Sequence, residues 1–475
     1  MSYYAVLGVA TILFVLLGAA IWLRTRCIAF VLGLALIYYW TLWGGWFIVY
    51  DLNGGESGMQ YSYFYYKLFP LHLDADYLRA LILYSIFVLL IEVALLFSAK
   101  GSGARFAVAQ PIRIFHSKML LVAIFSGTLS FLIVKESFGS AASLGFSAYQ
   151  YVRNDPSISR FFTLHQVLNR ICLFTTMMGL AIYFSGRTAK YIVGRGNSVH
   201  RALYLVVLAG IFVMNLMLGD RHDLVANFLT AGLFYLANAA KPKKVAMAIG
   251  CATALLAVGV VGMTRGVAVS NAVQNMGFAT AAASSLATFA TSNEPFAAHM
   301  SMYGSLHKNV ELTYGSSIIT FLSSAIPRVV WLNRPADIYS YYAFAVGAVE
   351  GQGYTIHHAT GWYLNFGTVG VVLGAALFGW TWGSRWTRFQ HVGEARSYWG
   401  QAFRIIAFWT FTASVSALLR SGPEGYKTVL VEGFFIPTLI VGFAGSRLML
   451  KFNRPRLIFG ENSISATRTG TGIAL

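Results

Sequence analysis

Four isolated arginines stand out in this 475-residue chain. Arg221, Arg265 and Arg420 lie at the ends of long apolar runs, and Arg328 lies in the long segment between two such runs. A guanidinium near lipid depth costs roughly 2.5–3.5 kcal/mol on insertion scales, so it needs a partner or a function. Its planar fork binds phosphate oxygens in pairs. Four such groups meeting at one cavity would bind a lipid-linked diphosphate without a metal ion. A structural ion pair at a helix end is the alternative for each arginine.

A histidine doublet, His357-His358, lies just before an apolar run that begins near Gly361. An imidazole can accept a proton from a sugar hydroxyl, so the doublet is a candidate catalytic base, and a hydrogen-bonded structural group is the equally weighted alternative. The sequence does not distinguish the two rings, and His299 and His307 are weaker candidates. Carboxylates that could orient an arginine or act as the base are secondary candidates: Asp223, Glu311 and Glu424.

One triplet, Asp74-Ala-Asp76, has the Asp-x-Asp spacing that holds a divalent metal in some lipid-dependent glycosyltransferases. A single triplet in a chain of this length is close to chance, so no metal and no other cofactor is expected. The sequence contains no phosphate-binding loop, dinucleotide fingerprint, zinc-binding helix or nucleophile elbow.

The composition places these residues in a membrane protein. Hydrophobic residues make up 57% of the chain and charged residues 11%, against roughly 25% charged in soluble domains. Runs of about 17–23 apolar residues, long enough to cross a ~30 Å hydrocarbon core, predict an all-α polytopic bundle of about eleven spans in one integral membrane domain, residues 1–475. The runs lie near 3–23, 28–50, 77–98, 119–135, 166–186, 202–218, 224–240, 245–263, 361–383, 402–419 and 428–446.

Basic residues are concentrated in alternate connections between these runs and in the C-terminal tail. The positive-inside rule makes these segments cytoplasmic, with the N-terminus outside and the C-terminus inside. The net charge of +18 is therefore a topology signal that anionic lipid can reinforce, and nucleic acid is not expected as a partner. Residues 264–360 become a large outward loop, too long to be unstructured, that caps the site.

Four motifs together resemble the O-antigen polysaccharide polymerase (Wzy-type) family, which is related to the O-antigen ligases. They are Leu-Gly-Asp-Arg (218–221), Ile-Pro-Arg-x-x-Trp-x-x-Arg-Pro (326–335), Trp-Tyr-Leu-Asn-Phe-Gly-x-x-Gly (362–370) and Leu-Arg-Ser-Gly (419–422). Their order and their shared outward placement carry the resemblance, which covers residues 215–425.

The resemblance implies a glycosyltransferase-C-like, metal-independent enzyme at the periplasmic face of the bacterial inner membrane. Such an enzyme transfers a growing chain en bloc from undecaprenyl diphosphate to a sugar hydroxyl of a new lipid-linked unit. The four arginines would bind the diphosphate, Arg328 also acting in catalysis, and His357 or His358 would be the base. Asn365 stands where the ligases carry a carboxylate. A chain-length regulator and a flippase are left open as partners.

Two other functions fit the same features. An O-antigen ligase would use the same donor with a lipid A core acceptor, and the sequence does not separate it from a polymerase. A flippase for lipid-linked oligosaccharides would carry internal repeats and helices broken at the membrane midplane. The sequence has no evident repeat, and its polar candidates gather on one predicted face, which favours an enzyme.

Overall fold

The computed structural model describes residues 2–53, 71–100, 112–113, 115–144, 161–181, 183, 192–193, 197–218, 294–324, 331, 337–348, 355–391, 398–436, 438–439 and 443, with isolated helical positions between 224 and 283. The chain divides into two units, Met1–Gly445 and Ser446–Leu475, and all described residues belong to the first. The described elements are helical apart from a two-residue parallel pairing of β1 (Ile112–Arg113) with β2 (Ile192–Val193), so the predicted helical fold class is confirmed.

Six helices in the described part of the chain are long and apolar enough to cross a membrane, and each coincides with a predicted run. The second is continuous through α2 (Ile28–Tyr38), the π-helical turn η1 (Tyr39–Trp43) and α3 (Gly44–Asn53). The other five are α1 (Tyr3–Thr25), α5 (Ala75–Ser98), α6 (His116–Leu144), α10 (Ser198–Leu218) and α18 (His358–Gln390).

Three further predicted runs correspond to shorter or less apolar helices. They are α9 (Phe162–Ala181), α19 (Tyr398–Ala413) with α20 (Val415–Leu419), and the π-helical η6 (Thr428–Phe435), which α21 (Gly425–Lys427) precedes. The runs near 224–240 and 245–263 lie almost wholly outside the described residues.

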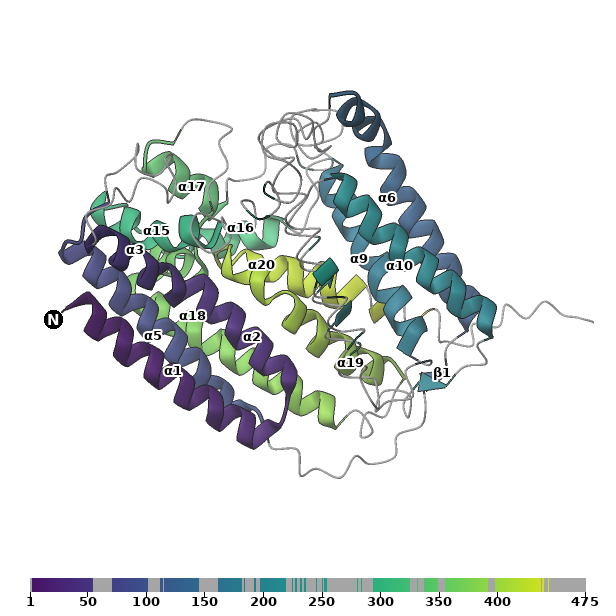
Figure 1. Ribbon diagram of the computed structural model, residues 1–475, viewed down its shortest axis with the longest axis horizontal. Coiled ribbons are helices and arrows are strands. Elements are labelled where there is room, and N and C mark those ends of the chain that lie inside the picture. The colour runs from purple at the N-terminus through teal and green to yellow at the C-terminus, as the bar shows by residue number, and fades with distance from the viewer. Residues whose placement is uncertain are drawn as a thin grey trace, which may run out of the picture. The chain divides into compact units, whose positions relative to one another are not determined.

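Helices α1, α5 and α18 lie side by side and run in the same direction (Figure 1). The starts of α1 and α5 meet, because the Tyr3 hydroxyl donates to the Asp74 carbonyl at 3.2 Å. Helix α18 starts beside the third turn of α5, where the Tyr84 and Thr360 hydroxyls are 3.3 Å apart. Asp74 begins α5 as a typical N-cap, its Oδ1 accepting from the Tyr77 amide at 2.8 Å.

The ends of α5 and α18 meet in the same way. The Thr387 hydroxyl donates to the Ser98 carbonyl at 2.9 Å and accepts from the Lys100 amide at 3.0 Å. Basic residues lie near or just beyond the ends of α1, α5 and α18: Arg24, Arg26, Lys100, Arg385 and Arg388. One further basic residue, Arg79, lies near the start of α5.

Helices α6, α9 and α10 pack on one another through polar contacts within a largely apolar interface (Figure 1). The Asn169 amide donates to Asn215 Oδ1 at 3.0 Å, and Ser130 Oγ is 2.8 Å from His165 Nδ1. Such interhelical hydrogen bonds stabilise helix packing in lipid, where the hydrophobic effect contributes little.

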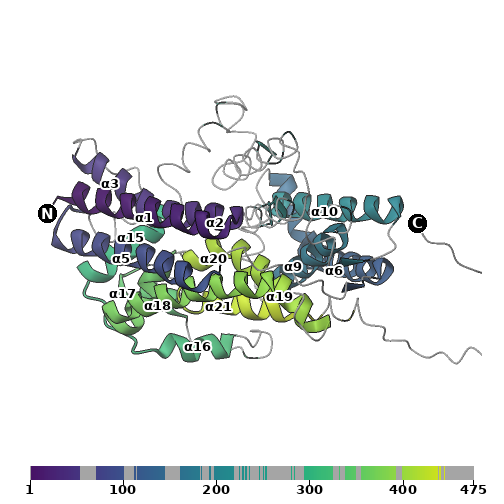
Figure 2. The same cartoon turned by 90° about the horizontal axis from the view of Figure 1, so that it is seen from below.

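The predicted loop 264–360 contains three described helices: α15 (Glu294–His307), α16 (Ser316–Ser324) and α17 (Ile338–Ala345). The described part of the loop is therefore folded, as its length predicts. Helix α15 packs beside α5 in both views (Figures 1 and 2) and also contacts η1 and α18.

Glu92 is a fully buried carboxyl group within α5 that faces α1, since a Cβ atom added at Gly18 would lie 3.3 Å from its Oε1. Neither carboxyl oxygen has a hydrogen-bond partner among the described residues. An unsatisfied buried polar group costs roughly 1–3 kcal/mol. We expect Glu92→Met to raise the free energy of unfolding by about this amount, measured by thermal denaturation in detergent. Glu92→Gln, which keeps a polar group, should gain little, and a destabilised methionine variant would contradict the expectation.

Candidate functional site

Both members of the histidine doublet are fully buried at the start of α18. His358 Nδ1 donates to the Ser421 carbonyl at 2.6 Å, and its Nε2 accepts from the Trp362 indole at 3.0 Å. His357 caps the helix, its Nδ1 accepting from the Ala359 amide at 3.1 Å. The proton is thereby assigned to His357 Nε2.

A third buried imidazole, His299 on α15, completes this network. His357 Nε2 donates to the Thr41 hydroxyl at 3.2 Å, and His299 Nδ1 donates to the Thr41 carbonyl at 2.8 Å. His299 Nε2 accepts from the Tyr77 hydroxyl at 3.2 Å. All six ring nitrogens of the three histidines are therefore hydrogen-bonded inside the protein, and in this conformation neither ring of the doublet presents a nitrogen to a substrate.

Two histidines of this network, His299 and His357, lie outside the membrane-spanning segments, and burial keeps both of them neutral. It lowers the pKa of His299 to about 4, against a partial opposing effect from the Thr41 carbonyl. Burial also lowers the pKa of His357 well below its usual value, and the neighbouring His358 and His299 lower it further. Neutral imidazoles match the one-donor, one-acceptor hydrogen bonding seen at each ring.

Helix α15 is tied to the start of α18 through serine and tyrosine hydroxyls. The His357 amide donates to Ser301 Oγ at 3.0 Å, and Ser301 Oγ donates to Thr360 Oγ1 at 2.8 Å. The Tyr84 hydroxyl donates to the His299 carbonyl at 2.8 Å. The α15 portion of the loop is thus fixed on α5 and α18.

The turn that carries Arg420 packs directly on the histidine doublet. Ser421 supplies the carbonyl that binds His358, and a Cβ atom added at Gly361 would lie 2.3 Å from Gly422 Cα. Arg420 itself is half-buried. Two motifs about sixty residues apart in the sequence therefore meet in space.

The same turn also binds the loop helix α17. Glu424 Oε1 accepts from the Ile338 amide at 3.0 Å, at the first residue of α17. Asp337 caps that helix by accepting from the Ser340 amide at 2.8 Å. Of the secondary carboxylate candidates, Glu424 therefore anchors the loop through a helix N-terminus, where the helix dipole favours a carboxylate.

Helix α18 is interrupted at Phe366 and Gly367, and Gly367 has φ +62°. Two carbonyls next to the interruption accept hydrogen bonds: the Asn365 side-chain amide donates to the Gly361 carbonyl at 2.7 Å, and the Thr313 backbone amide donates to the Leu364 carbonyl at 2.7 Å. Asn365 is thus a capping residue of the interrupted helix.

A cavity of about 530 Å³ lies beside this interruption, formed by the segment before α16, by α16 and by α17. Its lining is polar at several positions: Thr313, Ser316, Ser317, Thr320, Asp337, Ser340 and Tyr341. Glu311 is exposed nearby, its carbonyl accepting from the Tyr341 hydroxyl at 2.9 Å. A cavity of this size, with polar groups set in a mainly apolar lining, accommodates a small ligand or a sugar unit.

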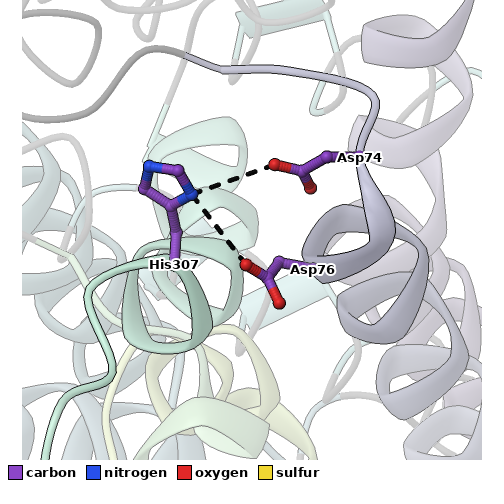
Figure 3. A group of neighbouring side chains, drawn as sticks. All are labelled: Asp74, Asp76 and His307. Carbon is purple, nitrogen blue, oxygen red and sulfur yellow. Dashed lines mark ion pairs between the residues drawn. The ribbon is translucent and has the colours of Figure 1, made fainter.

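A second cluster joins α5 and α15. The imidazole of His307 faces the carboxylates of Asp74 and Asp76 (Figure 3), with Nδ1 at 3.8 and 3.9 Å from their respective Oδ2 atoms. The sequence singled out Asp74 and Asp76 as a triplet and His307 separately. No sequence signal links His307 to the two aspartates, which lie more than 230 residues earlier in the chain.

The structure brings together part of the predicted site. His357, His358, Arg420 and Glu424 meet at the start of α18, and Glu311 lies near the adjoining cavity. Arg221, Asp223, Arg265 and Arg328 lie outside the described residues.

Comparison with protein-family models, curated proteins and solved structures finds no match. Sequence reasoning gave His299 little weight and missed the contributions of Thr41 and Ser301 to the network. Buried polar residues on apolar helices carry no spacing signal that could have identified them.

Gly361→Ala tests the contact between the two motifs. The added methyl group would meet Gly422 Cα at 2.3 Å, and backbone on both sides leaves little room to relax. Overpacking of this kind costs about 1–3 kcal/mol, so we expect a clear fall in the unfolding temperature. Gly8→Ala is the matched control, because nothing lies within 4 Å of its added Cβ atom and alanine favours a helix. Equal stability of the two variants would contradict the close contact.

Proposed function

We propose that this protein is a polysaccharide polymerase of the inner membrane of a bacterium, which transfers undecaprenyl-diphosphate-linked oligosaccharide to the sugar hydroxyl of a new lipid-linked unit. The observation that carries the proposal is the meeting of the Arg420 turn, the His358 helix start and the loop helix α17 beside a polar cavity. A cation, imidazoles and hydrogen-bonding groups for a sugar are thereby gathered at one end of the apolar helices.

The proposed topology has eleven spans, with the N-terminus and residues 264–360 in the periplasm and the C-terminus in the cytoplasm. Two observations support it. The first, third and ninth spans must run in the same direction, and α1, α5 and α18 do so. The basic residues near the ends of these three helices outnumber the one near their starts, Arg79, which supports a cytoplasmic assignment for those ends and a periplasmic one for the Arg420 turn.

The proposed reaction needs no external energy source. The acceptor hydroxyl oxygen forms a bond to the anomeric carbon as the bond from that carbon to the diphosphate oxygen breaks. The electron pair leaves with the diphosphate, whose growing charge Arg420 stabilises together with Arg221, Arg265 and Arg328. Fixed cations in a poorly hydrated site stabilise such charge strongly.

The acceptor proton passes to the histidine doublet in this proposal. His358 is the better placed ring, because it lies against the Arg420 turn. Its Nε2 lone pair is directed at the Trp362 indole, so it reaches a hydroxyl only after that indole turns away. Trp362 therefore acts as a positioning residue that couples substrate entry to availability of the base.

The test is incubation of the purified protein with lipid-linked repeat units alone. A ladder of lengthened lipid-linked chains is the expected product. Transfer of glycan only when a lipid A core acceptor is supplied would instead identify a ligase. Protection of the glycan from an external probe without new glycosidic bonds would identify a flippase. Either result would overturn the proposal.

A further inference from the structure

We propose that Asp74, Asp76 and His307 bind a divalent transition-metal ion between the start of α5 and the end of α15. The three donor atoms lie within 4.8 Å of one another and come from two separate elements (Figure 3). The side chains are 31–43% exposed, which leaves room for water ligands. This proposal departs from the metal-free chemistry expected from the family resemblance and does not depend on the proposed function.

The donor atoms are held in place before any ion arrives. Asp74 uses Oδ1 to cap α5, and its Oδ2 accepts from the Tyr303 hydroxyl at 3.0 Å. His307 stacks on the Tyr303 ring, with centroids 5.2 Å apart and planes 25° apart. Hydrogen-bonded partners behind the ligands are typical of metal sites, where they orient the side chains that bind the ion.

Tyr303 is suited to this supporting role. Burial raises the pKa of its phenol, and the hydrogen bond to Asp74 raises it further, so the group stays protonated and keeps donating. The hydrogen bond from the Tyr303 hydroxyl uses only part of the acceptor capacity of Asp74 Oδ2, so this oxygen can still bind a cation.

Charge and distance both favour an ion over a simple ion pair. Two adjacent carboxylates repel each other, and one histidine, even when protonated, offsets only one of their charges. The separations of 3.8 and 3.9 Å are longer than a direct hydrogen bond between His307 and either carboxylate. Two ligand atoms bonded to a tetrahedral ion at about 2 Å lie about 0.5 Å closer together than these separations. Small rotations of the side chains can close that difference.

The donor set selects the ion. Imidazole nitrogen suits Zn²⁺ and other transition metals, whereas Mg²⁺ prefers oxygen ligands and retains its waters. Two carboxylate oxygens with one imidazole fit Mn²⁺ or Zn²⁺. The bound ion would fix α15 on α5 and thereby hold His299 against Thr41 and Tyr77.

The test is a titration of the full-length protein in detergent with Mn²⁺, followed by electron paramagnetic resonance. We expect one bound Mn²⁺ per chain, displaced by Zn²⁺ but not by a similar concentration of Mg²⁺. Asp76→Asn and His307→Gln should each weaken binding more than about 100-fold, and Tyr303→Phe by about tenfold. Asp74 is left unchanged because it also caps α5.

His391→Gln is the matched control, since His391 lies at the far end of α18. It should leave Mn²⁺ binding unchanged. The ion should also raise the unfolding temperature of the wild type and of this control, but not of His307→Gln. Two results would overturn the metal site and leave the cluster as an ion pair. One is the absence of Mn²⁺ binding to the wild-type protein, and the other is equal binding by the wild type and by the Asp76→Asn and His307→Gln variants.

Discussion

Arg420→Ala is expected to lower chain lengthening at least about 100-fold in the purified protein. The guanidinium lies on the turn that binds His358 and α17, where it would stabilise the departing diphosphate. Loss of one preorganised stabilising group of this kind typically costs 10²–10³ in rate. The measurement is the rate of ladder formation from lipid-linked units, with membrane insertion and unfolding temperature recorded beside it.

Arg420→Lys separates charge from geometry. Lysine keeps the positive charge but loses the planar fork, so we expect an intermediate loss. Arg388→Ala is the matched control, because Arg388 is exposed near the opposite end of α18. Wild-type chain lengths in folded Arg420→Ala protein would reject this arginine as part of the site.

Acidification from pH 7 to pH 4 is expected to destabilise the protein by about 3 kcal/mol through His299 alone. Burial lowers the pKa of this ring to about 4 in the folded state, against about 6.5 when unfolded. The unfolded state therefore binds more protons between these values. The stabilisation is complete above about pH 6.5 and is lost as the pH falls through 4. Thermal unfolding across this range measures the slope.

His299→Asn isolates the contribution of this ring. Asparagine can still donate to the Thr41 carbonyl but does not titrate, so the variant should show a shallower pH dependence. A residual slope is expected from His357, whose pKa is also lowered by burial and by the two neighbouring histidines. An unchanged slope in His299→Asn would show that this ring does not govern the acid sensitivity.

Helices were predictable from the sequence because their signal is local. A run such as Ala75–Ser98 is mostly apolar, and its capping residue Asp74 immediately precedes it. The parallel order of α1, α5 and α18 also follows from counting spans. The interruption of α18 at Gly367 was not predicted, because glycine is common in membrane helices and the capping donor Thr313 is distant in sequence.

The site was predictable only in its residue types. The doublet and Arg420 stand out because histidine and arginine are costly near lipid. The packing of the Arg420 turn on the doublet, and the enclosure of both imidazoles, depend on Gly361 and Gly422 approaching each other, which no pattern within either motif encodes. His307 meets Asp74 and Asp76 only because α15 packs on the start of α5.

The interruption of α18 divides this helix into a short piece before Gly367 and a long piece after it. An unbroken helix of 33 residues would be about 50 Å long, well beyond a hydrocarbon core of about 30 Å. The piece that follows Gly367 is about 35 Å long and spans that core by itself. The preceding turns, from His358 to Asn365, are therefore not needed to cross that core. In the proposed polymerase, hydrophilic sugars would reach these turns without entering the hydrocarbon, while their lipid tails stay within it.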